Sequence, residues 1–217
     1  MTSTRIDGYE SSAVRQSVIH LAIEGFTDDS LKLAEKQLTV VARTGDLLEL
    51  AITHRLIGLV VAKQTIHTGT NQGGSTHAAL ALAGARASVV EAYFRGEEFN
   101  YRNGRIEIGR CYRAIGLIAA VDSMQSDPGL VTEDTSMHFD DAAQLMVAAP
   151  EADLESNSFA RAAAKALTEG TLPSLRLVNP LLLRPSRANP ENRLIHNILY
   201  DMQHQSALDA AATATIL

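Results

Sequence analysis

Seven histidines and a single cysteine, Cys111, are the side chains of this sequence best suited to metal binding or nucleophilic catalysis. No His-Glu-x-x-His or Glu-x-x-His pattern is present, although these spacings are the ones that place metal ligands on one face of a helix. His20 with Glu24, and Asp134 with His138, lie four residues apart, a spacing that ordinary helix surfaces also show. We therefore expect no metal site and no cofactor.

Nucleophilic and phosphate chemistry have no signature in the sequence either. It contains no Gly-x-Ser-x-Gly elbow and no phosphate loop that ends in Gly-Lys-Ser or Gly-Lys-Thr. The glycines of Asn71–Ser75 could cradle an anion at a helix start, but a plain connection accounts for them. Cys111 beside His54 or Tyr112 would act as a nucleophile only if its pKa were lowered, and no neighbouring residue indicates this. We predict no catalytic residue and expect Cys111 to pack as a small hydrophobe.

Four charged residues in otherwise apolar segments, Glu49, Arg55, Glu107 and Arg113, are the best candidates for a site. A charge that is buried needs a partner, and residues six apart on one helix do not face each other. We therefore predict pairing between segments, with Glu49 next to Arg113 and Glu107 next to Arg55. This arrangement would be a structural network, and a ligand-binding site is the alternative.

The same four residues belong to an internal repeat. Leu48–Ala62 (LELAITHRLIGLVVA) matches Ile106–Ala120 (IEIGRCYRAIGLIAA) in the pattern Glu-x5-Arg-x-Ile-Gly-Leu. The segments before them, 30–41 and 79–90, also align. We predict a duplicated helical hairpin over 30–66 and 79–125, with a short connection at Ala42–Gly45 and a longer one at Glu91–Asn103.

Two glycines of the repeat, Gly58 and Gly116, lie in the middle of predicted helices. Glycine inside a helix costs about 1 kcal/mol relative to alanine, so a compensating role is expected. We predict that both glycines mark close helix crossings.

Composition and periodicity predict an all-α fold. The chain has 217 residues, only 6 prolines and no tryptophan, and alanine is frequent, which favours helices. Apolar spacing and capping residues predict helices over about 11–25, 28–45, 46–65, 75–95 and 105–124, with another from about Glu191. The helix over 46–65 has almost no polar face, which indicates a central, buried position. The duplicated core would be either a helical repeat or a four-helix bundle.

The segment TGDLLELAITHRLIGLVVA (44–62) resembles the tetratricopeptide-like helical repeats attached to bacterial signalling and transcription regulators. The resemblance covers about residues 28–125, and the units are spaced more widely than the 34 residues usual for that family. It implies a non-catalytic scaffold that binds a peptide or a protein partner in a groove.

The second part of the chain differs in composition from the first. Residues 114–160 contain nine acidic side chains and no Lys or Arg, and 171–191 contain four prolines. We predict a helical core over 1–125 and a second region over 126–217, made of an acidic linker, short helices, a Pro-rich arm and a C-terminal helix. The acidic stretch could be a solvated linker or could dock a basic surface.

Charge and hydropathy limit the classes of partner. The Arg86–Arg113 region mixes arginines with aromatic residues as nucleic-acid surfaces do, but its glutamates and the overall pI of about 5.6 make nucleic acid an unfavoured partner. The longest apolar runs are far shorter than the roughly 18 residues needed to span a membrane, and no secretory signal opens the chain. We expect a cytoplasmic protein.

These patterns favour a non-enzymatic protein–protein interaction module, such as an adaptor, chaperone or regulatory domain. The expected partner is another protein or a second copy of the chain. The alternative is a structural subunit of a self-assembling particle of the phage or viral coat type, in which the Pro-rich arm reaches a neighbour. An enzyme with an unsignalled site is the third class.

Overall fold

The computed structural model describes residues 8–70, 73–126, 190–191, 193–195, 197–202 and 204–205. The helices in chain order are α1 (Gly8–Ile23), α2 (Thr27–Thr44), α3 (Leu47–Thr68), α4 (Gly74–Arg95) and α5 (Glu98–Ser126). No strand occurs among the described residues. The prediction of an all-α fold is confirmed.

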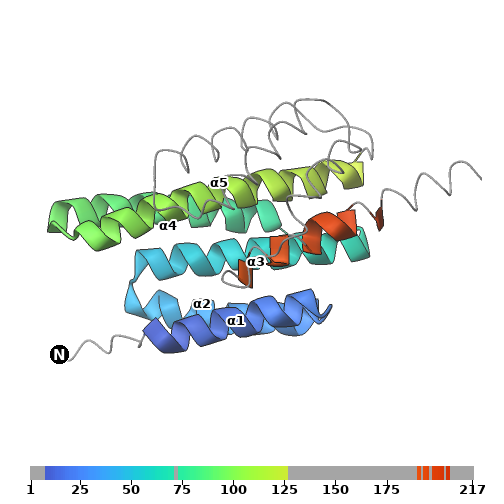
Figure 1. Ribbon diagram of the computed structural model, residues 1–217, viewed down its shortest axis with the longest axis horizontal. Helices are drawn as coiled ribbons and strands as arrows, with labels where there is room; N and C mark the ends of the chain where they lie inside the picture. The colour runs from blue at the N-terminus through green and yellow to red at the C-terminus, as the bar shows by residue number, and fades with distance from the viewer. Residues whose placement is uncertain are drawn as a thin grey trace, which may run out of the picture.

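Helix α3 is the centre of the molecule. It lies between the α1–α2 pair and the α4–α5 pair and packs against all four helices (Figure 1). Every side chain from Arg55 to Ile66 is buried, as predicted for a helix with little polar face. Because the turns between successive helices are short, neighbouring helices run antiparallel.

Two hairpins with matching turns make up most of the fold. Gly45 ends α2 and Gly96 ends α4, both in the left-handed backbone conformation that glycine adopts without strain. Asp46 then starts α3, because its carboxylate accepts hydrogen bonds from the backbone N–H groups of Leu48 and Glu49 at 3.1 and 3.0 Å. Both hairpins, α2–α3 and α4–α5, therefore turn within two residues.

The predicted long connection at Glu91–Asn103 is wrong. Helix α4 continues to Arg95 and α5 begins at Glu98, so only Gly96 and Glu97 join them. Gly104, the residue directly after the predicted connection, lies inside α5. A Cβ atom there would lie 2.7 Å from Cγ2 of Val89, so this glycine serves a close approach between α4 and α5.

Gly58 marks a close helix crossing, as predicted. A Cβ atom on it would lie 3.1 Å from Cδ1 of Ile118 and 3.2 Å from the carbonyl oxygen of Gly74. Gly116 is buried in α5, and its equivalence to Gly58 stays a prediction.

The two parts of the repeat align at different offsets, 58 residues for 48–62 on 106–120 and 49 residues for 30–41 on 79–90. Helix α5 has 29 residues and α3 has 22. The Glu-x5-Arg pattern starts four residues after Gly45 in one hairpin and eleven after Gly96 in the other. Seven residues are close to two helical turns, so the shift returns the pattern to nearly the same helix face. The superposition of 30–66 on 79–125 stays a prediction.

The second predicted region is described only at its C-terminal end. The acidic linker and the Pro-rich arm before Pro190 lie outside the described residues. The described positions between 190 and 205, here called the C-terminal segment, are all helical, as predicted. Their apolar side chains belong to the same core cluster as those of α1, α3 and α5.

Candidate functional site

A cluster of buried charges joins three parts of the chain. Arg55 of α3, Glu107 and Arg113 of α5 and Glu191 of the C-terminal segment are all buried, the two arginines to 1% exposure. These arginines are among the largest fully buried side chains. We call these four residues the buried ion cluster.

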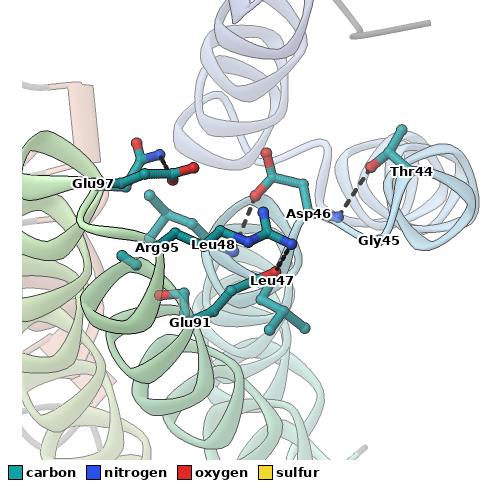
Figure 2. A pocket seen from close by; sticks show the side chains of 11 residues that line it. Thr44, Gly45, Asp46, Leu47, Leu48, Glu91, Arg95 and Glu97 are labelled. Atoms are coloured by element: carbon teal, nitrogen blue, oxygen red, sulfur yellow. Dashed lines mark hydrogen bonds and ion pairs between the residues drawn. The ribbon is translucent and has the colours of Figure 1, made fainter. Parts of the chain in front are cut away.

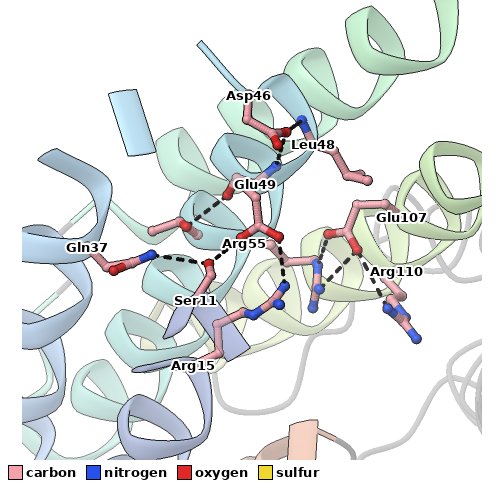
Figure 3. A network of polar contacts seen from close by, with 10 residues as sticks. Ser11, Arg15, Gln37, Asp46, Leu48, Glu49, Arg55, Glu107 and Arg110 are labelled. Atoms are coloured by element: carbon pink, nitrogen blue, oxygen red, sulfur yellow. Dashed lines mark hydrogen bonds and ion pairs between the residues drawn. The ribbon is translucent and has the colours of Figure 1, made fainter. Parts of the chain in front are cut away.

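The geometry of the buried ion cluster is that of a closed network. Arg55 makes a two-pronged contact with Glu107, with Nε–Oε1 and Nη2–Oε2 distances of 2.5 and 3.1 Å (Figure 3). Nη1 of Arg55 also contacts Oε1 of Glu191, and Nη2 of Arg113 donates to the same oxygen at 3.0 Å. Arg110, at the edge, lies 3.8 Å from Glu107. Each carboxylate therefore meets more than one guanidinium.

The electrostatics favour the ionised forms of Arg55 and Glu191, whereas burial lowers the pKa of Arg113. Burial by itself would raise the pKa of Glu191, but Arg55 and Arg113 lower it more, and the net pKa lies well below the usual range. Burial would likewise lower the pKa of Arg55, and the carboxylates of Glu107 and Glu191 raise it well above its ordinary value. Two cations and two anions thus balance one another in the interior. This balance suits a structural role, because each of the two buried guanidinium groups lies next to a buried carboxylate.

One predicted ion pair forms and the other does not. Arg55 with Glu107 is confirmed. The predicted pair of Glu49 with Arg113 is wrong, because Glu49 accepts a hydrogen bond from Ser11 of α1 at 2.6 Å and pairs with Arg15 at 3.4 Å (Figure 3). Its side chain is 24% exposed, so it is not a core charge.

Glu191 is the member of the buried ion cluster that sequence reasoning missed. Its position at the start of a predicted helix, ahead of the apolar spacing of Leu194, Ile198 and Met202, was the available signal. An acid beside an amphipathic stripe is common on surfaces, however. Only the packing of that stripe on α3 brings the carboxylate to Arg55 and Arg113.

Cys111 packs as a small hydrophobe, as predicted. It is buried with Ala51, Ala81 and Ala85 in a second, smaller cluster of apolar side chains. Burial, strengthened by the nearby carboxylate of Glu107, raises the pKa of the thiol well above its ordinary value. The thiol is therefore protonated at neutral pH and is a poor nucleophile.

His54 and His77 form a polar contact between α3 and α4. Their Nδ1 atoms are 2.9 Å apart, so one ring donates a hydrogen bond and the other accepts it. Burial lowers the pKa of both rings, and each is neutral at pH 7. No group of three or more His, Cys, Asp or Glu side chains is placed to hold a metal ion within the described ranges.

A cleft of about 310 Å³ lies between the turns of the two hairpins. Figure 2 shows Asp46 of the α2–α3 turn and Leu48 at the start of α3 together with Glu91, Arg95 and Glu97 from the α4–α5 hairpin. Arg95 is held by Glu91 at 2.6 Å. The lining thus has three acids and one base, and we call it the acidic cleft.

Next to the acidic cleft, the α4–α5 hairpin end exposes apolar side chains. Tyr93, Phe94 and Phe99 are 70%, 82% and 76% exposed, and Val90 is also exposed. The ring of Tyr93 contacts those of Phe94 and Tyr101, with centroids 5.7 and 6.2 Å apart. We call these five residues the aromatic tip.

The Arg86–Arg113 region does not form one basic surface. Arg113 is buried, and Arg86 is tied to Tyr112, whose hydroxyl accepts its hydrogen bond at 2.5 Å. Arg105 lies over the ring of Tyr101 at 5.9 Å. These three arginines are therefore divided between the interior and two separate ring contacts.

Among the described residues, no helix is both long and apolar enough to cross a membrane. No protein family, no curated protein and no solved structure matches the chain, so the resemblance to tetratricopeptide-like repeats stays a prediction.

Proposed function

We propose that the protein is a non-enzymatic helical interaction module that binds a protein partner at the aromatic tip and the acidic cleft. The observation that supports this most is the exposure of Tyr93, Phe94 and Phe99 within seven residues of one another. A contiguous group of exposed rings is unusual on a surface that serves only solubility, and such groups mark interaction sites.

The aromatic tip is not needed to build the core. The side chains that pair α4 with α3 and α5 are small, such as Ala78, Ala81 and Ala85, and they lie on the other face of α4. A rigid hairpin that carries rings at its end suits binding, because aromatic side chains lose little rotamer entropy when they are covered. Aromatic side chains are enriched at the buried centres of interfaces, and tyrosine is enriched among the residues that contribute most to binding.

The acidic cleft indicates the chemistry of the partner. Asp46, Glu91 and Glu97 share the lining with a single cation, Arg95, and a basic side chain of a partner would balance one of the two remaining negative charges. We therefore expect a partner segment that presents an apolar anchor to the rings and a Lys or Arg to the cleft.

The rival assignment, a structural subunit of a self-assembling particle, would use the same rings to contact further copies of the chain. A bound protein of another kind supports the adaptor function, and a second copy supports the subunit. An enzymatic role has less support, because the buried ion cluster is closed and the Cys111 thiol is protonated.

Photo-crosslinking in the cell of origin tests the proposal. A benzophenone amino acid replaces Phe94 in one variant and Phe26 in the control. Phe26 is 59% exposed at the α1–α2 turn, at the far end of α2 from the cleft. We expect a discrete adduct at position 94 that is lost when Phe99→Ser is added, with no equivalent adduct at position 26.

The mass of the adduct separates the two assignments. An adduct of two 23.3 kDa chains would identify self-association, and any other discrete mass would identify a partner. Equal adducts at both positions, or none at position 94, would contradict the proposal.

A further inference from the structure

His54 of α3 and His77 of α4 face each other where these two helices pack. Their Nδ1 atoms are 2.9 Å apart, and the ring centroids are 5.1 Å apart with the ring planes tilted by 40°. Both residues are only half-buried, so they are not sealed inside the core as the buried ion cluster is. We call these two residues the histidine pair.

Close backbone contacts on both sides of the histidine pair fix the separation of α3 and α4. A Cβ atom on Gly58 would lie 3.2 Å from the carbonyl oxygen of Gly74, and one on Gly84 would lie 3.4 Å from Cβ of Ala51. Along both helices the histidine pair lies between these two contacts. The helices therefore hold the two rings at a set distance, and sites on rigid helices are more precise than sites on loops.

The distance within the histidine pair fits two ligands of one metal ion. Imidazole is the commonest metal ligand in proteins, and its nitrogen binds a metal ion at about 2.0–2.1 Å. Two such nitrogens at a right angle around one ion lie roughly 2.9 Å apart, which is the separation of the two Nδ1 atoms. Right-angled ligands are typical of the square-planar and tetragonal sites of Cu²⁺ and Ni²⁺.

The charges around the histidine pair are compatible with a bound cation. One ring now donates a hydrogen bond from Nδ1 to the other. If that ring carries its proton on Nε2 instead, both Nδ1 lone pairs can bind the ion and no proton is released. Burial lowers the pKa of His77, and the nearby carboxylate of Glu35 on α2 raises it, so a negative charge lies beside the pair.

We propose that the histidine pair binds a divalent transition-metal ion, Cu²⁺ or Ni²⁺, with both Nδ1 atoms as ligands and water in the remaining positions. The metal-binding patterns that the sequence lacks place both ligands on one helix, whereas these two histidines come from two helices that pack together. The histidine pair shares no residue with the aromatic tip or the acidic cleft. This inference and the proposed function can therefore fail independently.

Calorimetric titration of the full-length chain with Cu²⁺ tests the site. Cu²⁺ is the most sensitive probe, because it binds nitrogen ligands more tightly than the other divalent ions of its row. The two variants are His54→Gln and His77→Gln, and the control is His20→Gln. His20 is exposed on α1 and lies four residues before Glu24, so it represents an ordinary surface pair.

We expect the wild type to bind one Cu²⁺ per chain at its tightest site. Removal of a group that only orients a metal ligand costs about 10–100-fold in affinity, so loss of either histidine should weaken this site by at least about tenfold. His20→Gln should leave the affinity unchanged. An unchanged affinity in His54→Gln or His77→Gln, or an equal loss in His20→Gln, would overturn the proposal and leave the pair as a hydrogen bond only.

Pulsed electron paramagnetic resonance covers the case in which a histidine variant does not fold. The spectrum is recorded on the wild type with one equivalent of Cu²⁺, and it counts the imidazole rings bound to the ion. Two bound rings would support the proposal. One ring or none would overturn it.

Discussion

Glu49 and Glu107 occupy the same position in the repeated Glu-x5-Arg pattern, yet their surroundings differ. The side chain of Glu107 is 2% exposed and binds Arg55 in the interior. The side chain of Glu49 is 24% exposed and binds Ser11 and Arg15 of α1 (Figure 3). The repeat therefore places a glutamate at the same position in both helices, whereas the neighbouring element determines which residue that glutamate binds.

The two arginines of the pattern show the same effect in a different way. Arg55 and Arg113 are equally buried, but Arg55 takes Glu107 from within the repeat while Arg113 takes Glu191 from outside it. Helix α1 thus supplies the partners of Glu49 in the first unit, and the C-terminal segment supplies the partner of Arg113 in the second unit. Stability should depend strongly on Glu107 and Glu191 and weakly on Glu49.

The largest effect is expected for Glu107→Gln. This change removes the negative charge that balances Arg55 and leaves a buried guanidinium poorly compensated. Loss of one partner of a buried ion pair typically costs about 3–5 kcal/mol, so we expect a fall of that size in the free energy of unfolding. Urea denaturation followed by circular dichroism measures it.

Glu97→Gln is the control for that measurement. Glu97 is exposed at the α4–α5 turn, and its carboxylate accepts a hydrogen bond from the exposed side chain of Asn100, so its replacement should change stability by less than about 0.5 kcal/mol. Equal losses for the two variants would show that burial does not distinguish these carboxylates.

An intermediate effect is expected from acid. Since the pKa of Glu191 is lower in the folded protein than its ordinary value of 4.5, its contribution to stability is complete above pH 4.5. It is lost as the pH falls below that value towards the lower pKa of the folded state, with a slope of up to about 1.4 kcal/mol per pH unit. Denaturation between pH 5 and pH 2 should therefore show a steeper loss for the wild type than for Glu191→Gln. Identical slopes would contradict the assignment.

The sequence predicted the helices better than the partners of their charges. Apolar spacing and capping residues located α2, α3 and α4 within a few residues, because these signals are local. The start of α5 was missed, because a glycine at position 104 fits the end of a loop as well as a close approach to Val89 inside a helix. Arg55 and Glu107 could be paired from the repeat, but Glu191 is 78 residues from Arg113, and no local pattern links them.

The smallest effects test whether Glu49 is separate from the buried ion cluster. Glu49→Gln weakens a partly exposed ion pair, which is typically worth about 0–1 kcal/mol. Because Glu49 binds residues of α1 while Arg113 binds Glu191, Glu49→Gln and Arg113→Met should add within about 0.5 kcal/mol in the double variant. For Arg113→Met and Glu191→Gln, the double variant should instead lose less stability than the sum of the two single losses, by about 1–3 kcal/mol. Arg113→Met already leaves Glu191 without this cation, so removing the charge of Glu191 as well costs less than in the wild type. A coupling of that size between Glu49 and Arg113 would mean that Glu49 also interacts with the buried ion cluster. Glu49 and Glu107 would then not have the separate partners described above.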